Sequence, residues 1–171
     1  MSGPEMARPP ATLSQSGASN PRVSSWVTAS AGTGKTQVLT DRVLRLLLAG
    51  TPPSAILCLT FTRAAAAVMK ARVTASLAKW ATATDAVLKD DLRLMRFGEE
   101  ATAAELSIAR RLFAGVLDAP GGLRILTIHA FCESLLSRFP IESGVAPHFQ
   151  VMDDRTASEH LDAAQIGRAH V

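Results

Sequence analysis

The sequence predicts an α/β fold built on a parallel sheet with helices on both faces, and three observations support this prediction. Short runs of strand-forming residues alternate with longer stretches whose apolar residues recur at helical spacing. Such alternation is typical of parallel strands joined by helical crossovers. The length of 171 residues suits about one domain, and an apolar fraction of 47% is sufficient for a hydrophobic core.

Three segments are expected to form the strands. Residues 23–29 (VSSWVTA) are rich in β-forming side chains. Residues 55–61 (AILCLTF) form a continuous apolar run, as expected for a strand that is covered on both faces. Residues 123–128 (LRILTI) follow a Pro-Gly-Gly turn and are the third candidate.

Helices are expected between and after these strands, over residues 35–48, 64–80 and 129–139. Residues 81–120 are charged, have a helical pattern and lack strand signals, so they are interpreted as an inserted helical region. In the first helix the apolar residues predicted to share one face are Val38, Leu39, Val43, Leu46 and Leu47.

The expected domain organisation follows from these elements. Residues 1–12, which are rich in proline and small side chains, are expected to be a mobile tail. Residues 13–80 form the first part of the α/β domain, residues 81–120 the helical insertion, and residues 121–164 the continuation of the α/β domain.

Residues 165–171 (QIGRAHV) have an unusual feature, because a common sequencing-library adapter can encode them. We interpret this segment as read-through into adapter sequence, which makes the chain a fragment. The alternative interpretation is an ordinary helix end.

Composition limits the classes of function. The net charge of +3, contributed mostly by arginine, permits a polyanionic partner without demanding one. Aromatic residues make up 5% of the chain and tyrosine is absent, which excludes a stacking platform of many rings. Cys58 and Cys132 lie in apolar surroundings and are expected to be reduced core residues. With no apolar run typical of a membrane span or a secretory signal, we expect a cytoplasmic protein.

The strongest motif is the sequence ASAGTGKT, which lies between a predicted strand and a predicted helix. Two glycines allow the backbone to turn so that its N–H groups point at phosphate oxygens, and the helix N-terminus adds partial positive charge. The lysine is expected to reach the β- and γ-phosphates and the last threonine to ligate Mg²⁺, so both are also candidate catalytic residues. The predicted nucleotide-binding residues are Ala29, Ser30, Ala31, Gly32, Thr33, Gly34, Lys35 and Thr36.

Two further motifs follow predicted strands. In LTFTRAAAAVM, Thr60, Phe61 and Thr62 fall at a strand's carboxyl end, where open α/β sheets bind ligands. A threonine hydroxyl can bind a phosphodiester and an exposed phenylalanine can stack on a base. Taken alone, this motif equally fits a core Phe61 with a solvated Arg63, and TIHAFC fits a capping or core His129.

In this order, the three motifs resemble motifs I, Ia and Ib of UvrD-type superfamily 1 DNA helicases, over residues 12–154. Their residues are most similar to the AddA family of helicase–nuclease subunits, which act in double-strand-break repair. The resemblance implies a partial RecA-like P-loop NTPase domain that uses ATP and Mg²⁺, single-stranded or duplex DNA as partner, and an AddB-type partner subunit. It also implies that Gln15 reads adenine. It places DNA-binding roles on Thr60, Phe61, Thr62, Arg63 and His129.

The sequence departs from the helicase pattern at several points. Gln37 and Val68 replace an Arg and a Glu that relatives often have, and Asp153-Asp154 does not follow a strand as an Asp-Glu box would. The arginine finger and the later motifs are not found either, so the fragment alone is expected to be catalytically inactive. The alternatives are an ATP-gated switch without unwinding activity and a small-molecule kinase.

Overall fold

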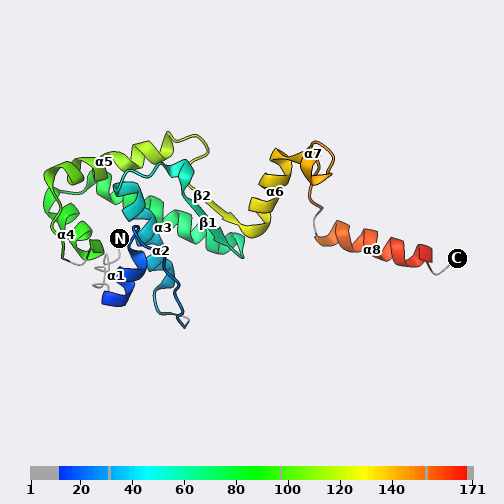
Figure 1. Ribbon diagram of the computed structural model, residues 1–171, viewed down its shortest axis with the longest axis horizontal. Coiled ribbons are helices and arrows are strands. Elements are labelled where there is room, and N and C mark those ends of the chain that lie inside the picture. Colours follow the sequence, from blue (N-terminus) through cyan, green and yellow to red (C-terminus); the bar gives the residue numbers. More distant parts are fainter. Residues whose placement is uncertain (1–11, 31, 97, 153, 169–171) are drawn as a thin grey trace, which may run out of the picture. The chain divides into compact units, whose positions relative to one another are not determined.

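The computed structural model describes residues 12–30, 32–96, 98–152 and 154–168, which fall into two compact units that meet between Thr127 and Ile128 (Figure 1). In the first unit the elements are α1 (Leu13–Ser19), α2 (Lys35–Leu48), the 3₁₀ turn η1 (Pro53–Ala55), β1 (Leu57–Thr60), α3 (Arg63–Thr82), α4 (Asp85–Arg96), α5 (Ala103–Leu117) and β2 (Arg124–Thr127). In the second unit they are α6 (Ile128–Arg138), α7 (Pro140–Ser143) and α8 (Asp154–Arg168).

The sheet of the first unit has two parallel strands, which confirms the α/β class. β1 pairs with β2 in a register that aligns Leu57 with Arg124 and Thr60 with Thr127. Helix α3 packs against both strands. Leu57 and Leu59 on β1 are 41% and 44% exposed, so the expectation that this strand is covered on both faces is wrong within the described residues.

The expected strand over residues 23–29 is also not observed. Residues 24–30 have no regular secondary structure and are exposed, with Trp26 95% exposed. A strand forms only where a neighbouring strand satisfies its N–H and C=O groups, and β-forming side chains cannot replace that pairing.

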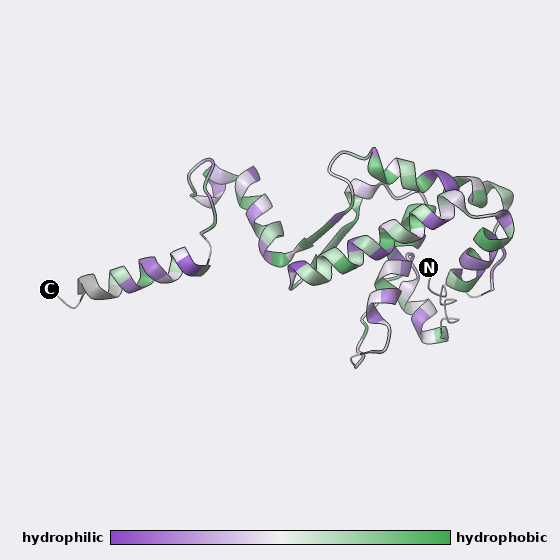
Figure 2. Ribbon diagram, turned by 180° about the vertical axis from the view of Figure 1, so that it is seen from behind, coloured by the Kyte–Doolittle hydropathy of each residue, from purple (hydrophilic) through white to green (hydrophobic). Residues whose placement is uncertain are grey.

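The core of the first unit lies where α2, α3, α4 and α5 meet. Helix α3 places Met69, Val73, Leu77 and Trp80 on this side because they recur every three or four residues. Figure 2 shows the apolar residues concentrated along α3 and the two strands. Helix α2 has the predicted bounds, but Leu39 is exposed and does not share the buried face.

The region predicted to be an insertion is helical, because α4 and most of α5 are amphipathic. Whether it is an insertion, and where the domain boundaries lie, stay predictions. Residues 1–11 of the predicted mobile tail lie outside the described residues, whereas Thr12 caps α1.

The second unit begins with α6, which matches the helix predicted over residues 129–139 to within one residue. Cys132 is exposed on α6, so its assignment to the core is wrong. Cys58 on β1 is half-buried, and burial raises the pKa of its thiol. The backbone of α8 is helical to Arg168, while the origin of residues 165–171 stays a prediction. No helix in the described part of the chain has both the length and the apolar character that crossing a membrane requires.

Candidate functional site

The glycine loop before α2 has the backbone geometry that its sequence predicts. Gly32 and Gly34 have φ angles of 80° and 84°, which side-chain-bearing residues rarely adopt. Gly34 is the N-cap of α2 and makes no side-chain capping hydrogen bond. The N–H groups of the first turn of α2 therefore face the loop without a side-chain cap, an arrangement that suits an anion. Ala31 lies outside the described residues.

The side chain of Lys35 folds back onto this loop. Its ammonium donates hydrogen bonds to the carbonyls of Ala29 and Ser30, with a distance of 2.6 Å to the Ser30 oxygen. The Thr33 hydroxyl donates to the same Ser30 carbonyl across 2.8 Å. The loop therefore holds one exposed cation at its centre by neutral acceptors alone, which an incoming phosphate could replace with charged ones.

Gln15 lies against the loop although it is 18 residues away from it in sequence. Its Nε2 atom donates to the Thr33 carbonyl across 3.3 Å. Its Oε1 atom accepts from the Thr12 backbone N–H across 2.8 Å, completing a capping box at the start of α1. The structure thus brings Gln15 to the predicted nucleotide loop, and its reading of adenine stays a prediction.

Two residues at the start of α2 complete this part of the site. The Thr36 side chain is half-buried in the first turn, and the Thr36 carbonyl accepts from the Thr40 hydroxyl across 2.8 Å. Gln37, a departure from the helicase pattern, donates from Nε2 to Oδ1 of the buried Asp41 across 2.8 Å. At this position the side chain therefore serves a contact within α2.

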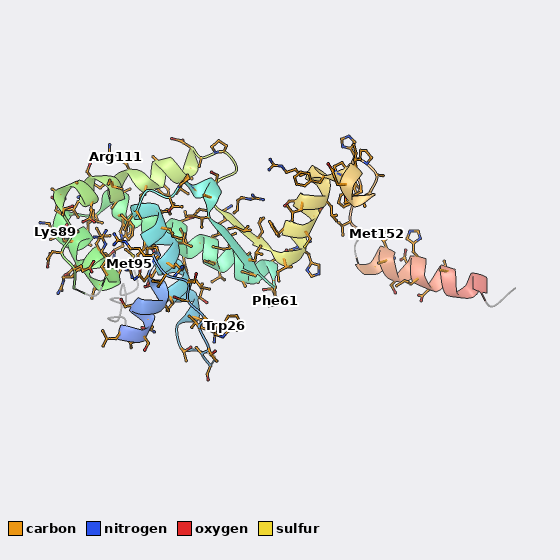
Figure 3. The ribbon with its side chains drawn as sticks, in the orientation of Figure 1. Trp26, Phe61, Lys89, Met95, Arg111 and Met152 are labelled. Carbon is orange, nitrogen blue, oxygen red and sulfur yellow. The ribbon has the colours of Figure 1, made fainter. Side chains whose placement is uncertain are left out.

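The second motif lies at the carboxyl end of β1. Phe61 is 86% exposed, so the alternative that places it in the core is wrong (Figure 3). Thr62 is the N-cap of α3, and its hydroxyl accepts from the Ala65 N–H across 3.1 Å. The Thr60 hydroxyl donates to the Thr62 carbonyl across 3.0 Å, and Arg63 is exposed in the first turn of α3. An exposed ring beside a cation and two hydroxyls is a combination that can bind a nucleic-acid strand.

His129 belongs to the second unit. It is the second residue of α6 and is exposed, so neither the core nor the capping alternative describes it.

The motifs found in the sequence include neither the helix that carries Gln15 nor the two arginines that hold it. Arg42 and Arg45 on α2 donate to carbonyl and hydroxyl oxygens of α1 and the turn after it. Two signals in the sequence could have revealed them. Thr12 and Gln15 have capping-box spacing, and two arginines three residues apart interrupt an otherwise apolar helix.

Comparison with known proteins decides the family. The model of the UvrD/REP helicase N-terminal domain matches residues 12–168, nearly the whole described chain. The chain belongs to the UvrD/REP helicase family. The match includes both the loop with Lys35 and the motif with Phe61, so the UvrD/REP helicase domain is the frame in which their geometry is interpreted.

Similar proteins within the UvrD/REP helicases each bear the name of one subunit of an ATP-dependent helicase/nuclease. The protein from Lactobacillus gasseri is 35% identical over 135 residues, which cover 79% of this chain and 9% of the relative. The protein from Latilactobacillus sakei is 35% identical over 140 residues, covering 82% of this chain and 13% of the relative. This chain therefore spans only about a tenth of the length of these relatives.

Proposed function

We propose that this chain is the ATP-binding, RecA-like first segment of an ATP-dependent DNA helicase, of the helicase/nuclease type that serves double-strand-break repair. The observation that carries the proposal is the loop in which Gly32 and Gly34 adopt left-handed conformations and Lys35 opens α2 with its ammonium turned into the loop. The names of the relatives support ATP dependence and a DNA substrate.

The residues of the loop fit a nucleoside triphosphate. The Lys35 ammonium and the N–H groups at the start of α2 supply positive charge and donors for phosphate oxygens. The Thr36 hydroxyl is a hard oxygen ligand at the same helix start, which suits Mg²⁺. No group of three acidic, histidine or cysteine side chains that could hold a metal occurs among the described residues. Mg²⁺ would therefore depend on the nucleotide phosphates together with Thr36.

When bound, ATP supplies the phosphoryl group whose hydrolysis drives movement. Lys35 would orient and neutralise the terminal phosphates, and Gln15 would present its amide to the adenine edge. The acid that positions water and the arginine that stabilises the transition state would come from outside this chain, so the chain alone would bind nucleotide without turnover.

Single-stranded DNA would bind at the carboxyl end of β1. The exposed Phe61 ring offers a stacking surface for a base, while Arg63 and the hydroxyls of Thr60 and Thr62 can contact phosphates. His129 is proposed to contact the same strand. The word subunit in the relatives' names supports a partner of the AddB type for the complete protein.

The test is nucleotide binding by the complete protein that carries this chain, measured by displacement of a fluorescent ATP analogue with Mg²⁺. Lys35→Ala removes hydrogen bonds to a charged group, worth about 1.5–3 kcal/mol, so we expect roughly a 10- to 150-fold loss of ATP affinity. Lys89→Ala on α4 removes an exposed lysine far from the loop sequence and is the matched control. Equal ATP affinity in the Lys35 and Lys89 variants would overturn the proposal.

A further inference from the structure

Helix α1, which carries Gln15, has no apolar face with which to hold its place. All seven of its residues are described, and Ser19, 2% exposed, is the only buried one. Its one large apolar side chain, Leu13, is 86% exposed. A helix of seven residues is not stable on its own in water. The position of α1 therefore depends on polar contacts with α2.

Arg42 supplies most of these contacts through one guanidinium. Its Nη1 donates to the carbonyls of Ala18 and Asn20 across 3.2 and 2.6 Å, and its Nη2 donates to the carbonyl of Val23 across 2.7 Å. These acceptors are the last turn of α1, its C-cap and the turn that follows. Only the planar guanidinium fork can serve three separated carbonyls at once, because a lysine ammonium is a single point charge.

Arg45, one turn further along α2, adds a second attachment. Its Nη1 donates to the Ser19 hydroxyl across 3.0 Å and to the Ser16 carbonyl across 3.4 Å. Burial lowers the pKa of the Arg45 guanidinium, which is consistent with a cation partly removed from water. Together the two arginines bind the carboxyl-terminal half of α1 to the middle of α2.

The amino-terminal half of α1 meets the start of the same helix α2. Gln15 donates to the Thr33 carbonyl, and a Cβ atom on Gly34 would lie 3.3 Å from the Gln15 Nε2 atom. Helix α1 thus bridges two points on one rigid element: the glycine loop at the start of α2, and the arginines two turns into it. The distance of the Gln15 amide from the loop is set by the arginines, since little buried apolar surface contributes.

We propose that Arg42 is a positioning residue for base selection: by holding α1 on α2 it fixes the Gln15 amide beside the loop, where it recognises the base of an adenine nucleoside triphosphate. This inference rests on the proposed nucleotide-binding function. It adds that adenine selectivity depends on a guanidinium that touches neither base nor phosphate.

The experiment compares three competitors, ATP, GTP and inorganic tripolyphosphate, against a fluorescent ATP analogue with Mg²⁺ in the complete protein. Tripolyphosphate reports the loop alone, and the ratio of the GTP to the ATP dissociation constant reports base selection. We expect Arg42→Lys to narrow this ratio roughly three- to tenfold, the size of one or two neutral hydrogen bonds, and to leave tripolyphosphate affinity within about twofold. Gln15→Ala should narrow the ratio equally, and the double variant should narrow it no further.

Arg93→Lys, an exposed arginine on α4, is the matched control and should leave all three affinities unchanged. Should Arg42→Lys fail to fold, Ser19→Ala decides the question, because it removes only the hydroxyl that Arg45 binds; it should narrow the ratio in the same direction. An unchanged ratio in the variant that folds overturns the inference, as does an equal loss for all three competitors. A wild-type protein that binds tripolyphosphate but prefers no base overturns the inference and leaves the phosphate loop standing; one that binds none of the three overturns the proposed function as well.

Discussion

The Lys35 ammonium donates a hydrogen bond of 2.6 Å to the carbonyl of Ser30, five residues earlier in the same loop. The loop is thereby closed on itself by the cation that we propose binds the nucleotide phosphates. Exchange of a neutral carbonyl for a charged phosphate oxygen strengthens this contact, because charge-assisted hydrogen bonds are roughly twice as strong as neutral ones. The loop therefore needs little rearrangement beyond the lysine side chain to accept a triphosphate.

Replacement of Phe61 by alanine tests the DNA surface. Stacking of a base on an aromatic side chain is worth about 1–3 kcal/mol, so Phe61→Ala should weaken binding of single-stranded DNA roughly 5- to 150-fold. The salt dependence should not change, because no cation is removed. Anisotropy titrations in the complete protein measure both quantities, with Ile141→Ala, equally exposed in the second unit, as control. DNA affinity equal to that of the control would refute a stacking role for Phe61.

Thr62 combines a structural contact with its proposed contact to DNA, and two variants separate them. Its hydroxyl oxygen accepts from the Ala65 N–H, so Thr62→Ala should lower the free energy of unfolding by about 1 kcal/mol. Thr62→Ser keeps the cap and the O–H donor, and should match the wild type in thermal unfolding and in DNA affinity. We also expect Thr62→Ala to weaken single-stranded DNA binding a few-fold to about tenfold while nucleotide affinity stays the same. Weaker nucleotide binding with unchanged DNA affinity would favour the ATP-gated switch.

Glu105 links pH to the stability of α5. Its carboxylate accepts from the Thr102 backbone N–H across 2.9 Å and pairs with Arg96 across 2.7 Å, and these contacts lower its pKa below the ordinary value of 4.5. A carboxyl group with a lowered pKa stabilises the fold above pH 4.5, and this stabilisation is lost as pH falls through the lowered pKa.

Glu105→Gln keeps the capping box and removes the ion pair with Arg96. At pH 7 it should lower the free energy of unfolding by about 0.2–1 kcal/mol, since the pair is partly exposed. The difference from the wild type should shrink below pH 4.5. Urea unfolding of this chain between pH 7 and pH 3 measures it, and a difference that grows as the pH falls would contradict the assigned sign.

The sequence predicted those elements whose signals are local. The bounds of α2 follow from the glycine loop before Lys35 and the apolar spacing up to Leu48, and α6 follows in the same way. The strand expected around Trp26 could not be judged locally, because a strand depends on a partner that the side-chain pattern does not reveal.

The candidate site was predicted in its residues more fully than in its geometry. Lys35 and the two loop glycines lie as their motif requires. The contact of Gln15 with Thr33 spans 18 residues, and nothing in the local pattern of α1 shows that it folds back to the loop. The exposure of Phe61 was likewise undecided, because an aromatic residue at a strand end can face either the core or the solvent.

The most direct test of the proposed function is the rate of ATP hydrolysis by the complete protein, measured with and without single-stranded DNA. We predict that single-stranded DNA raises the rate of the wild type at least about tenfold, because both ligands bind to elements that converge on one α/β core. We predict that Lys35→Ala abolishes hydrolysis in both conditions, and that Phe61→Ala retains the basal rate while losing most of the stimulation. A wild-type rate that single-stranded DNA leaves unchanged, or a Lys35→Ala rate within about threefold of the wild type, would contradict the proposed function.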